Sequence, residues 1–169
     1  MSISFSTCDL CDAHKDDHSG AFRVLAPGFQ DFGGVSTFAG QLVTVRCHED
    51  NSIVKQILER EAGQGRVLLV DGAGSVNRAL MGGSIAAAAA RNGWAGVVVF
   101  GAVRDVAELR AAPMGVRALA LVPMPTSRAG QGQRDVVLNV AGCTVRPEEW
   151  LYADADGMVV SDRALHAIS

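Results

Sequence analysis

The stretch GGSIAAAAARNGWAGVVVFGAVRD, residues 82–105, contains the residue types that a small anionic ligand needs. A glycine pair, Gly82-Gly83, opens a run of five alanines that ends at an Asn-Gly pair. This pattern predicts a helix over about residues 84–92. The apolar run over residues 96–101 follows it and predicts a strand that is covered on both faces.

The helix and the strand have nearly equal lengths, so the chain should return to where the helix begins. Roughly eight helical steps rise ~12 Å, and four strand steps return ~13 Å. Arg104 and Asp105 should therefore lie beside the free backbone N–H groups of Gly83, Ser84 and Ile85. Such N–H groups favour an anion, a guanidinium can hold a carboxylate through two bonds, and an aspartate offers oxygen to a divalent cation. The alternative is a plain glycine turn and a solvated Arg-Asp pair, with the aspartate capping the next helix.

A second glycine-containing turn, DGAGS over residues 71–75, follows another apolar strand pattern. It lacks the spacing of a dinucleotide-binding or Walker fingerprint. Because it ends the strand that precedes the 82–105 stretch, it is predicted to line the same crevice. Asp71 could assist a metal-bound water there, or it could cap its own turn.

Two further groups of polar residues have the types that metal sites use. Residues 48–50 (His-Glu-Asp) could serve as metal or acid–base groups, but acids before a helix more often complement its N-terminus. Cys8, Cys11, His14 and His18 have spacings near those of zinc sites. We favour a capped opening helix for that segment, with the cysteines as small apolar residues.

Composition limits the classes of function. The chain has 169 residues with 49% apolar content, which predicts one domain over residues 1–169. The net charge of −3 and the pI near 5.7 provide no basic field, so direct nucleic-acid binding is disfavoured. No stretch is long and apolar enough for a membrane span or a secretory leader, and the four cysteines are not densely spaced. We expect a soluble, cytoplasmic protein with reduced thiols.

The remaining elements alternate strands with helices in the middle of the chain and form hairpins later. Strands are predicted over residues 41–47, 66–70, 116–122, 135–140, 142–145 and 158–160, and helices from about residue 51 to 61 and over 106–112. Residues 19–35 are predicted to be a loop, residues 146–150 a turn, and a short helix should follow residue 160. The pattern predicts an α/β fold with β/β/α layers and a central mixed sheet.

Nearly the whole chain resembles the regulator of ribonuclease activity A family, which also holds the 4-hydroxy-4-methyl-2-oxoglutarate aldolases. The matching stretches, in order, are TCDLCD (7–12), FGGVSTFAG (32–40), VTVRCHEDN (43–51), VLLVDGAGS (67–75), GAVRD (101–105) and YADADGMVV (152–160). The resemblance implies the swivelling β/β/α fold. It also implies a homotrimeric ring or a hexamer of two rings, with sites near subunit boundaries.

The aldolase branch of this family implies a metal-dependent lyase reaction. A divalent cation, Mg²⁺ or Mn²⁺, would be bound by Asp105, partly through waters. The pyruvoyl carboxylate of a small 2-oxo acid would sit on the helix start at Gly82, Gly83, Ser84 and Ile85, and Arg104 would hold substrate oxygens. Metal and arginine would stabilise the pyruvate enolate that forms on carbon–carbon cleavage. Decarboxylation of oxaloacetate passes through the same enolate.

One position departs from the pattern of the active aldolases. They carry an acidic residue where this chain has Gly83, and that acid manages a proton. Asp71 or a carboxylate of a neighbouring subunit could substitute for it. The alternative function is a non-catalytic ring protein that binds and inhibits an RNA-degrading enzyme. A menaquinone-synthesis methyltransferase, suggested by old naming in the family, lacks support because no glycine-rich nucleotide fingerprint is present.

Overall fold

Four parallel strands form the middle of the fold. The computed structural model describes residues 3–166 of the chain. In spatial order, the four strands are β3 (Phe38–Arg46), β4 (Val67–Asp71), β6 (Gly96–Val103) and β7 (Gly115–Leu121). Their central residues are almost entirely buried, as near-continuous apolar runs predict for strands covered on both faces.

Antiparallel strands extend this sheet at both edges and make it mixed. Beyond β3 lie β11 (Trp150–Asp154), β12 (Gly157–Ser161) and β1 (Phe22–Val24), and beyond β7 lies β2 (Gln30–Asp31). Two short strands pair beside this path, β5 (Ala79–Met81) with β6 and β8 (Gln133–Arg134) with β3. A separate hairpin joins β9 (Leu138–Val140) to β10 (Cys143–Val145). The predicted α/β fold with a central mixed sheet is confirmed.

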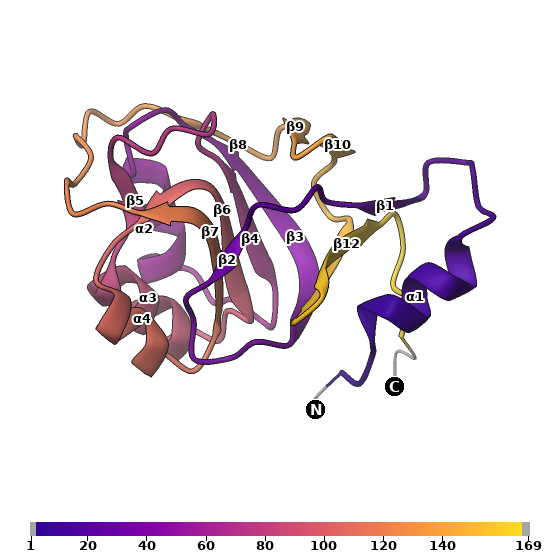
Figure 1. The fold of residues 1–169 in the computed structure, drawn as a ribbon. Helices are drawn as coiled ribbons and strands as arrows, with labels where there is room; N and C mark the ends of the chain where they lie inside the picture. Colours follow the sequence, from indigo (N-terminus) through magenta and orange to yellow (C-terminus); the bar gives the residue numbers. More distant parts are fainter. Residues whose placement is uncertain (1–2, 167–169) are drawn as a thin grey trace.

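Three helices cover one face of the sheet: α2 (Ser52–Arg60), α3 (Gly83–Arg91) and α4 (Val106–Ala111) (Figure 1). Alternate residues of β4 divide between the two sides, which is the two-residue period of a strand. Leu68 and Val70 face the helices, whereas Val67 and Leu69 pack with residues of β9 to β12 on the other face. The core therefore has two apolar layers, with the parallel strands between them.

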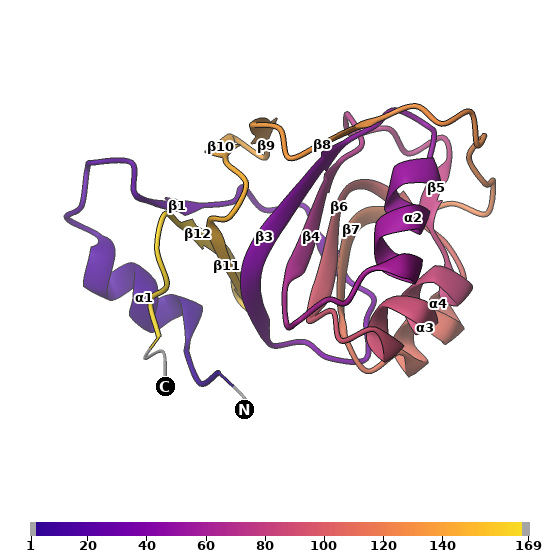
Figure 2. The same cartoon turned by 180° about the vertical axis from the view of Figure 1, so that it is seen from behind.

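The helix α1 (Thr7–His14) lies apart from the other helices, against β11 and β12 (Figure 2). Its N-cap is Ser6, whose hydroxyl accepts a hydrogen bond from the Asp9 N–H at 3.3 Å. The predicted opening helix is thus present. None of the helices within residues 3–166 is long and apolar enough to cross a bilayer.

The predicted turn at 146–150 is present, although its last residue, Trp150, begins β11. Two other expectations about local structure were wrong. Residues 19–35, predicted to be a loop, contain the short strands β1 and β2, which were missed because edge strands of two or three residues have too little periodicity to recognise. No helix forms over residues 162–166, where the chain bends instead, and residues 167–169 lie outside the described residues.

The Phe38 ring requires glycine on two adjacent strands. Gly96 and Gly115 are register partners at the start of β6 and β7. A Cβ added to Gly96 would lie 2.6 Å from Cδ2 and Cε2 of Phe38, and one added to Gly115 would also collide with the ring. The two glycines thus provide the space that the aromatic side chain occupies.

We expect Gly96→Ala to lower the free energy of unfolding by about 1–3 kcal/mol, because the methyl group overpacks the Phe38 ring. Urea denaturation measures this change. In a Phe38→Leu background the same substitution should cost less, because the ring atoms that collide are absent. An equal cost in both backgrounds would contradict this explanation.

Asp50 fastens the loop before β8 to the start of α2. Its buried carboxylate accepts hydrogen bonds from the Ser52 hydroxyl at 2.6 Å and the Ser52 N–H at 2.9 Å. The Ala129 and Gln131 N–H groups donate to the other oxygen at 2.8 and 3.2 Å. Burial opposes ionisation, but the bonds from Ser52, Gln131 and Ala129 outweigh it and lower the pKa of Asp50 to about 2. Residues 48–50 therefore include a structural acid, as the capping interpretation predicted.

Asp50→Asn should destabilise the protein at pH 7 by about 1–3 kcal/mol, because an amide cannot accept all four hydrogen bonds. The folded-state pKa lies below the ordinary value of 3.8, so the carboxylate stabilises the fold above pH 3.8 and less as pH falls toward about 2. The stability difference between wild type and Asp50→Asn should shrink across that range. Asp162→Asn, at an exposed carboxylate, is the matched control and should show little difference at any pH.

Candidate functional site

The start of α3 and the end of β6 lie side by side because β5 runs parallel to β6. Met81, the last residue of β5, pairs with Val103, and the Arg104 N–H donates to the Met81 carbonyl at 3.0 Å. The chain then turns at Gly82 into α3. The meeting of helix start and strand end that the path lengths predict is thus present.

Asp105 caps α3 from across this junction. Its Oδ2 accepts a hydrogen bond from the Gly83 N–H at 3.0 Å, and Gly82, the N-cap residue, has no side chain that could do so. A Cβ on Gly82 would lie 2.6 Å from the same Oδ2, so the close approach requires glycine there. Asp105 also occupies the N-cap position of α4, with a left-handed backbone (φ 65°), but its side chain does not cap that helix. Asp105 therefore caps a helix, as the alternative interpretation predicted, but the helix is α3 and not the following helix α4.

Arg104 lies over Gly82. A Cβ on Gly82 would lie 3.3 Å from the Arg104 Cγ and 3.4 Å from its Nε. The Nε is 4.0 Å from Asp105 Oδ2, and Nη1 donates to the Pro123 carbonyl at 3.3 Å. The side chain remains 39% exposed. The guanidinium is thus held at the junction while part of it faces solvent.

The first turn of α3 provides further donors. Among the described residues, no acceptor is found for the backbone N–H groups of Ser84 and Ile85. The Ser84 residue is exposed, whereas the Ile85 side chain is buried in the core under the helices. The N–H groups, the positive end of the helix dipole and Arg104 together favour a small carboxylate.

The donor set fits a hydrated divalent cation. The Asp105 side chain is 43% exposed, and of its two oxygens only Oδ2 receives the Gly83 N–H. Within residues 3–166, no three His, Cys, Asp or Glu side chains gather as a metal cluster. Mg²⁺ commonly keeps several waters and binds through one or two carboxylates, so a single exposed aspartate suits it.

Asp71 is already engaged in its own turn. Its Oδ1 accepts a hydrogen bond from the Ala73 N–H at 2.9 Å, and its Oδ2 lies 4.0 Å from Arg46 Nε. Its register partner on β6 is Phe100, before the junction at Arg104. These contacts favour the turn-capping alternative, and the supporting role of Asp71 at the site stays a prediction.

The other candidate polar groups also have structural partners. Hydrogen bonds from the Ser75 hydroxyl and the Asn77 amide lower the pKa of Glu49 and join two loops. In α1, His14 Nδ1 lies 2.8 Å from the Leu10 carbonyl and the ring stacks on Phe22. These contacts agree with the opening helix that we favoured over a zinc site.

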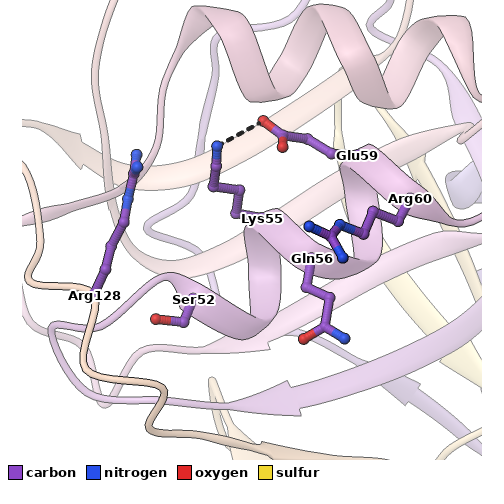
Figure 3. A pocket seen from close by; sticks show the side chains of 6 residues that line it. All are labelled: Ser52, Lys55, Gln56, Glu59, Arg60 and Arg128. Atoms are coloured by element: carbon purple, nitrogen blue, oxygen red, sulfur yellow. Dashed lines mark ion pairs between the residues drawn. The ribbon is translucent and has the colours of Figure 1, made fainter.

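A concavity lined by none of the junction residues lies along α2 (Figure 3). It has a volume of about 360 Å³ and is lined by polar side chains of α2 together with Arg128. Lys55 and Glu59 form an ion pair of 3.2 Å within it. The lining therefore resembles an ordinary solvated helix face.

Sequence reasoning missed Glu108. This side chain lines a concavity of about 500 Å³ between α3 and α4, together with Gly83 and Ser84. The only sequence signal is its place three residues after Asp105, in the first turn of α4. That signal is weak, because acids are common in first turns of helices for electrostatic reasons.

Comparison with known proteins agrees with this fold. The RraA-like family (Aldolase/RraA) matches residues 7–160. A protein of Albidiferax ferrireducens, provisionally named a 4-hydroxy-4-methyl-2-oxoglutarate aldolase, is 60% identical over 95% of this chain and 97% of its own length. The structure of the RNA-processing inhibitor RraA from Thermus thermophilis is 44% identical, with a TM-score of 0.88 over 95% of this chain and 94% of that one.

A second similar structure is described as an S-adenosylmethionine:2-dimethylmenaquinone methyltransferase from Geobacillus kaustophilus. It is 41% identical, with a TM-score of 0.88 over 95% of this chain and 97% of that chain. The Albidiferax relative and the two similar structures thus have three different names, although both structures share this fold. The family match spans most of the chain and two structures above 40% identity agree with it, so the chain belongs to the RraA-like family.

Proposed function

We propose that this protein is a divalent-metal-dependent lyase of the 4-hydroxy-4-methyl-2-oxoglutarate aldolase and oxaloacetate decarboxylase type. The observation that carries the proposal is the 3.0 Å bond between Asp105 and the Gly83 N–H, beside Arg104 and free helix N–H groups. The provisional name of the Albidiferax relative, at 60% identity, supports the same activity. A small 2-oxo acid would be the substrate.

Different residues of the junction would bind different groups of the substrate. The N–H groups of Ser84 and Ile85 would hold the carboxylate of the pyruvoyl part, as a helix N-terminus holds other anions. Arg104 would hold the oxygens of the same part and orient the scissile bond. Fixed donors aimed at an oxygen that becomes negative stabilise the transition state without reorganisation.

Asp105 would hold the cation, Mg²⁺ or Mn²⁺, with waters completing its coordination. When bound, the cation supplies positive charge that polarises the substrate carbonyl. The Gly83 N–H binds Oδ2 of Asp105, and the carboxylate stays partly exposed, so it would be accessible to a hydrated cation. Homotrimeric or hexameric assembly and a cytoplasmic location stay predictions of the family resemblance.

Asp105→Ala should reduce pyruvate release from 4-hydroxy-4-methyl-2-oxoglutarate and from oxaloacetate by roughly 10²-fold or more, because the carboxylate for the cation is lost. The assay couples pyruvate to lactate dehydrogenase, with added Mg²⁺ or Mn²⁺. Since Asp105 also caps α3, the thermal midpoint of each variant is measured as well. Asp105→Asn keeps an acceptor for the Gly83 N–H and separates the two losses. Full activity in a folded Asp105→Asn variant would contradict the metal role.

The second candidate function is inhibition of an RNA-degrading enzyme by protein contact. The similarity to the RNA-processing inhibitor from Thermus favours it. The net charge of −3 supports contact with a protein rather than with RNA. If this is the function, the purified protein should slow a purified ribonuclease of its host and should release no pyruvate with either metal. Asp105→Ala should then leave inhibition unchanged.

A further inference from the structure

A concavity of about 350 Å³ is lined by the chain between β1 and β2 and by the turn between β11 and β12. None of the junction residues lines it. Apolar side chains dominate its lining, among them Val24, Leu25, Phe29 and Met158, and Arg117 of β7 is the one cation among its described lining residues. A mostly apolar wall with a single charged group is typical of small-molecule sites of this size.

Arg117 is buried, yet part of its guanidinium has no partner. Its neighbours on β7, Val116 and Ala118, face the helices, so Arg117 points to the opposite side of the sheet. The residue is 5% exposed, and Nη2 donates to the carbonyls of Ser36 at 2.6 Å and Asp154 at 3.0 Å. In the described part of the chain, no acceptor is found for Nε or Nη1. Arg117 thus keeps unused donors although it lies inside the fold.

The charge of this guanidinium is only partly compensated. Asp31 Oδ2 lies 3.8 Å from Nη2, and the other oxygen of Asp31 accepts a backbone N–H. The ring of Phe38 lies 5.8 Å from the guanidinium carbon. Asp156, an acid at the concavity, is the main cause of the raised pKa of the Cys8 thiol, so its carboxylate lies toward α1. A buried charge with a distant ion pair and free N–H groups favours an anion.

We propose that this concavity binds a small monocarboxylate with an apolar body, whose carboxylate is held by Arg117. Because Arg117 lines the concavity, the little of it that solvent reaches faces that space. Nη1 would donate to the carboxylate, and the apolar side chains would cover the hydrocarbon part. The nearby carboxylates of Asp31 and Asp156 disfavour a dianion such as phosphate. This site is separate from the junction and independent of the proposed lyase reaction.

The probe is 4-methylpentanoate, which has an apolar body and lacks the 2-oxo group of a pyruvate-like substrate. Its titration into the full-length protein, followed by saturation-transfer NMR, should show saturable binding. The neutral analogue 4-methylpentanamide should bind at least about tenfold more weakly, because it lacks the charge that pairs with the guanidinium. Acetate should also bind at least about tenfold more weakly, since each buried methylene is worth roughly fourfold in affinity.

Two variants test the place of binding. Arg117→Met should weaken binding of 4-methylpentanoate at least about tenfold, and Arg104→Met, at the junction, is the matched control that should leave it unchanged. Since Arg117 also donates to two carbonyls, the thermal midpoint is measured as well. Ala26→Glu keeps Arg117 and adds a competing carboxylate at the exposed rim of the concavity, so it should weaken binding to a similar extent. Ala62→Glu adds the same charge at an exposed position outside it and should match wild type.

Four results would overturn the proposal. Wild type that shows no saturable binding at roughly 10 mM probe would leave Arg117 as a brace between β7 and its neighbours only. Equal affinity for the carboxylate and the amide would remove the role of the charge. Unchanged affinity in a folded Ala26→Glu variant would place the probe elsewhere. A loss of affinity in Arg104→Met that exceeds the loss in Arg117→Met would assign the probe to the junction.

Discussion

The hydrogen bond from the Gly83 N–H to Asp105 Oδ2 determines the arrangement of the candidate site. At 3.0 Å it joins the first turn of one helix to the residue that begins the next. It can form only because Gly82 lacks a Cβ, which would lie 2.6 Å from that oxygen. An acid that is held in this way keeps one orientation, and the neighbouring donors of α3 keep theirs. The site is therefore prepared before any ligand arrives, which reduces the cost of ordering it on binding.

The two-sided core explains why this junction is rigid. Both faces of β4 and β6 are covered by apolar residues, one by the helices and one by the strands of the later hairpins. The ends of strands buried on both faces have little freedom to shift, so Arg104 and Asp105 leave β6 at a fixed position. The burial of both faces also made these strands predictable from the sequence, because near-continuous runs of Val and Leu indicate parallel strands that are covered on both faces. The short edge strands β1, β2 and β8 carried no such signal and depended on their neighbours for pairing.

The position of the candidate site was predicted from the lengths of a helix and a strand. The predicted place of Arg104 and Asp105 beside Gly82 and Gly83 is correct, but β6 continues to Val103, and the junction depends on the pairing of β5 with β6, which the sequence did not predict. The capping partner was not predictable, because Asp105 precedes α4 in sequence and a cap is normally sought on the following helix. Glu108 was missed for a related reason. Its position over Gly83 depends on how closely α4 approaches α3, and that distance is a property of packing between elements rather than of any local pattern.

The filled space above Gly83 has a consequence for how such sites are compared between relatives. The Glu108 carboxylate, which belongs to α4, lies where a side chain at position 83 of α3 would begin. A sequence comparison restricted to position 83 would therefore find no acid at the first turn of α3. Superposition of side-chain atoms would instead find the Glu108 carboxylate at that place.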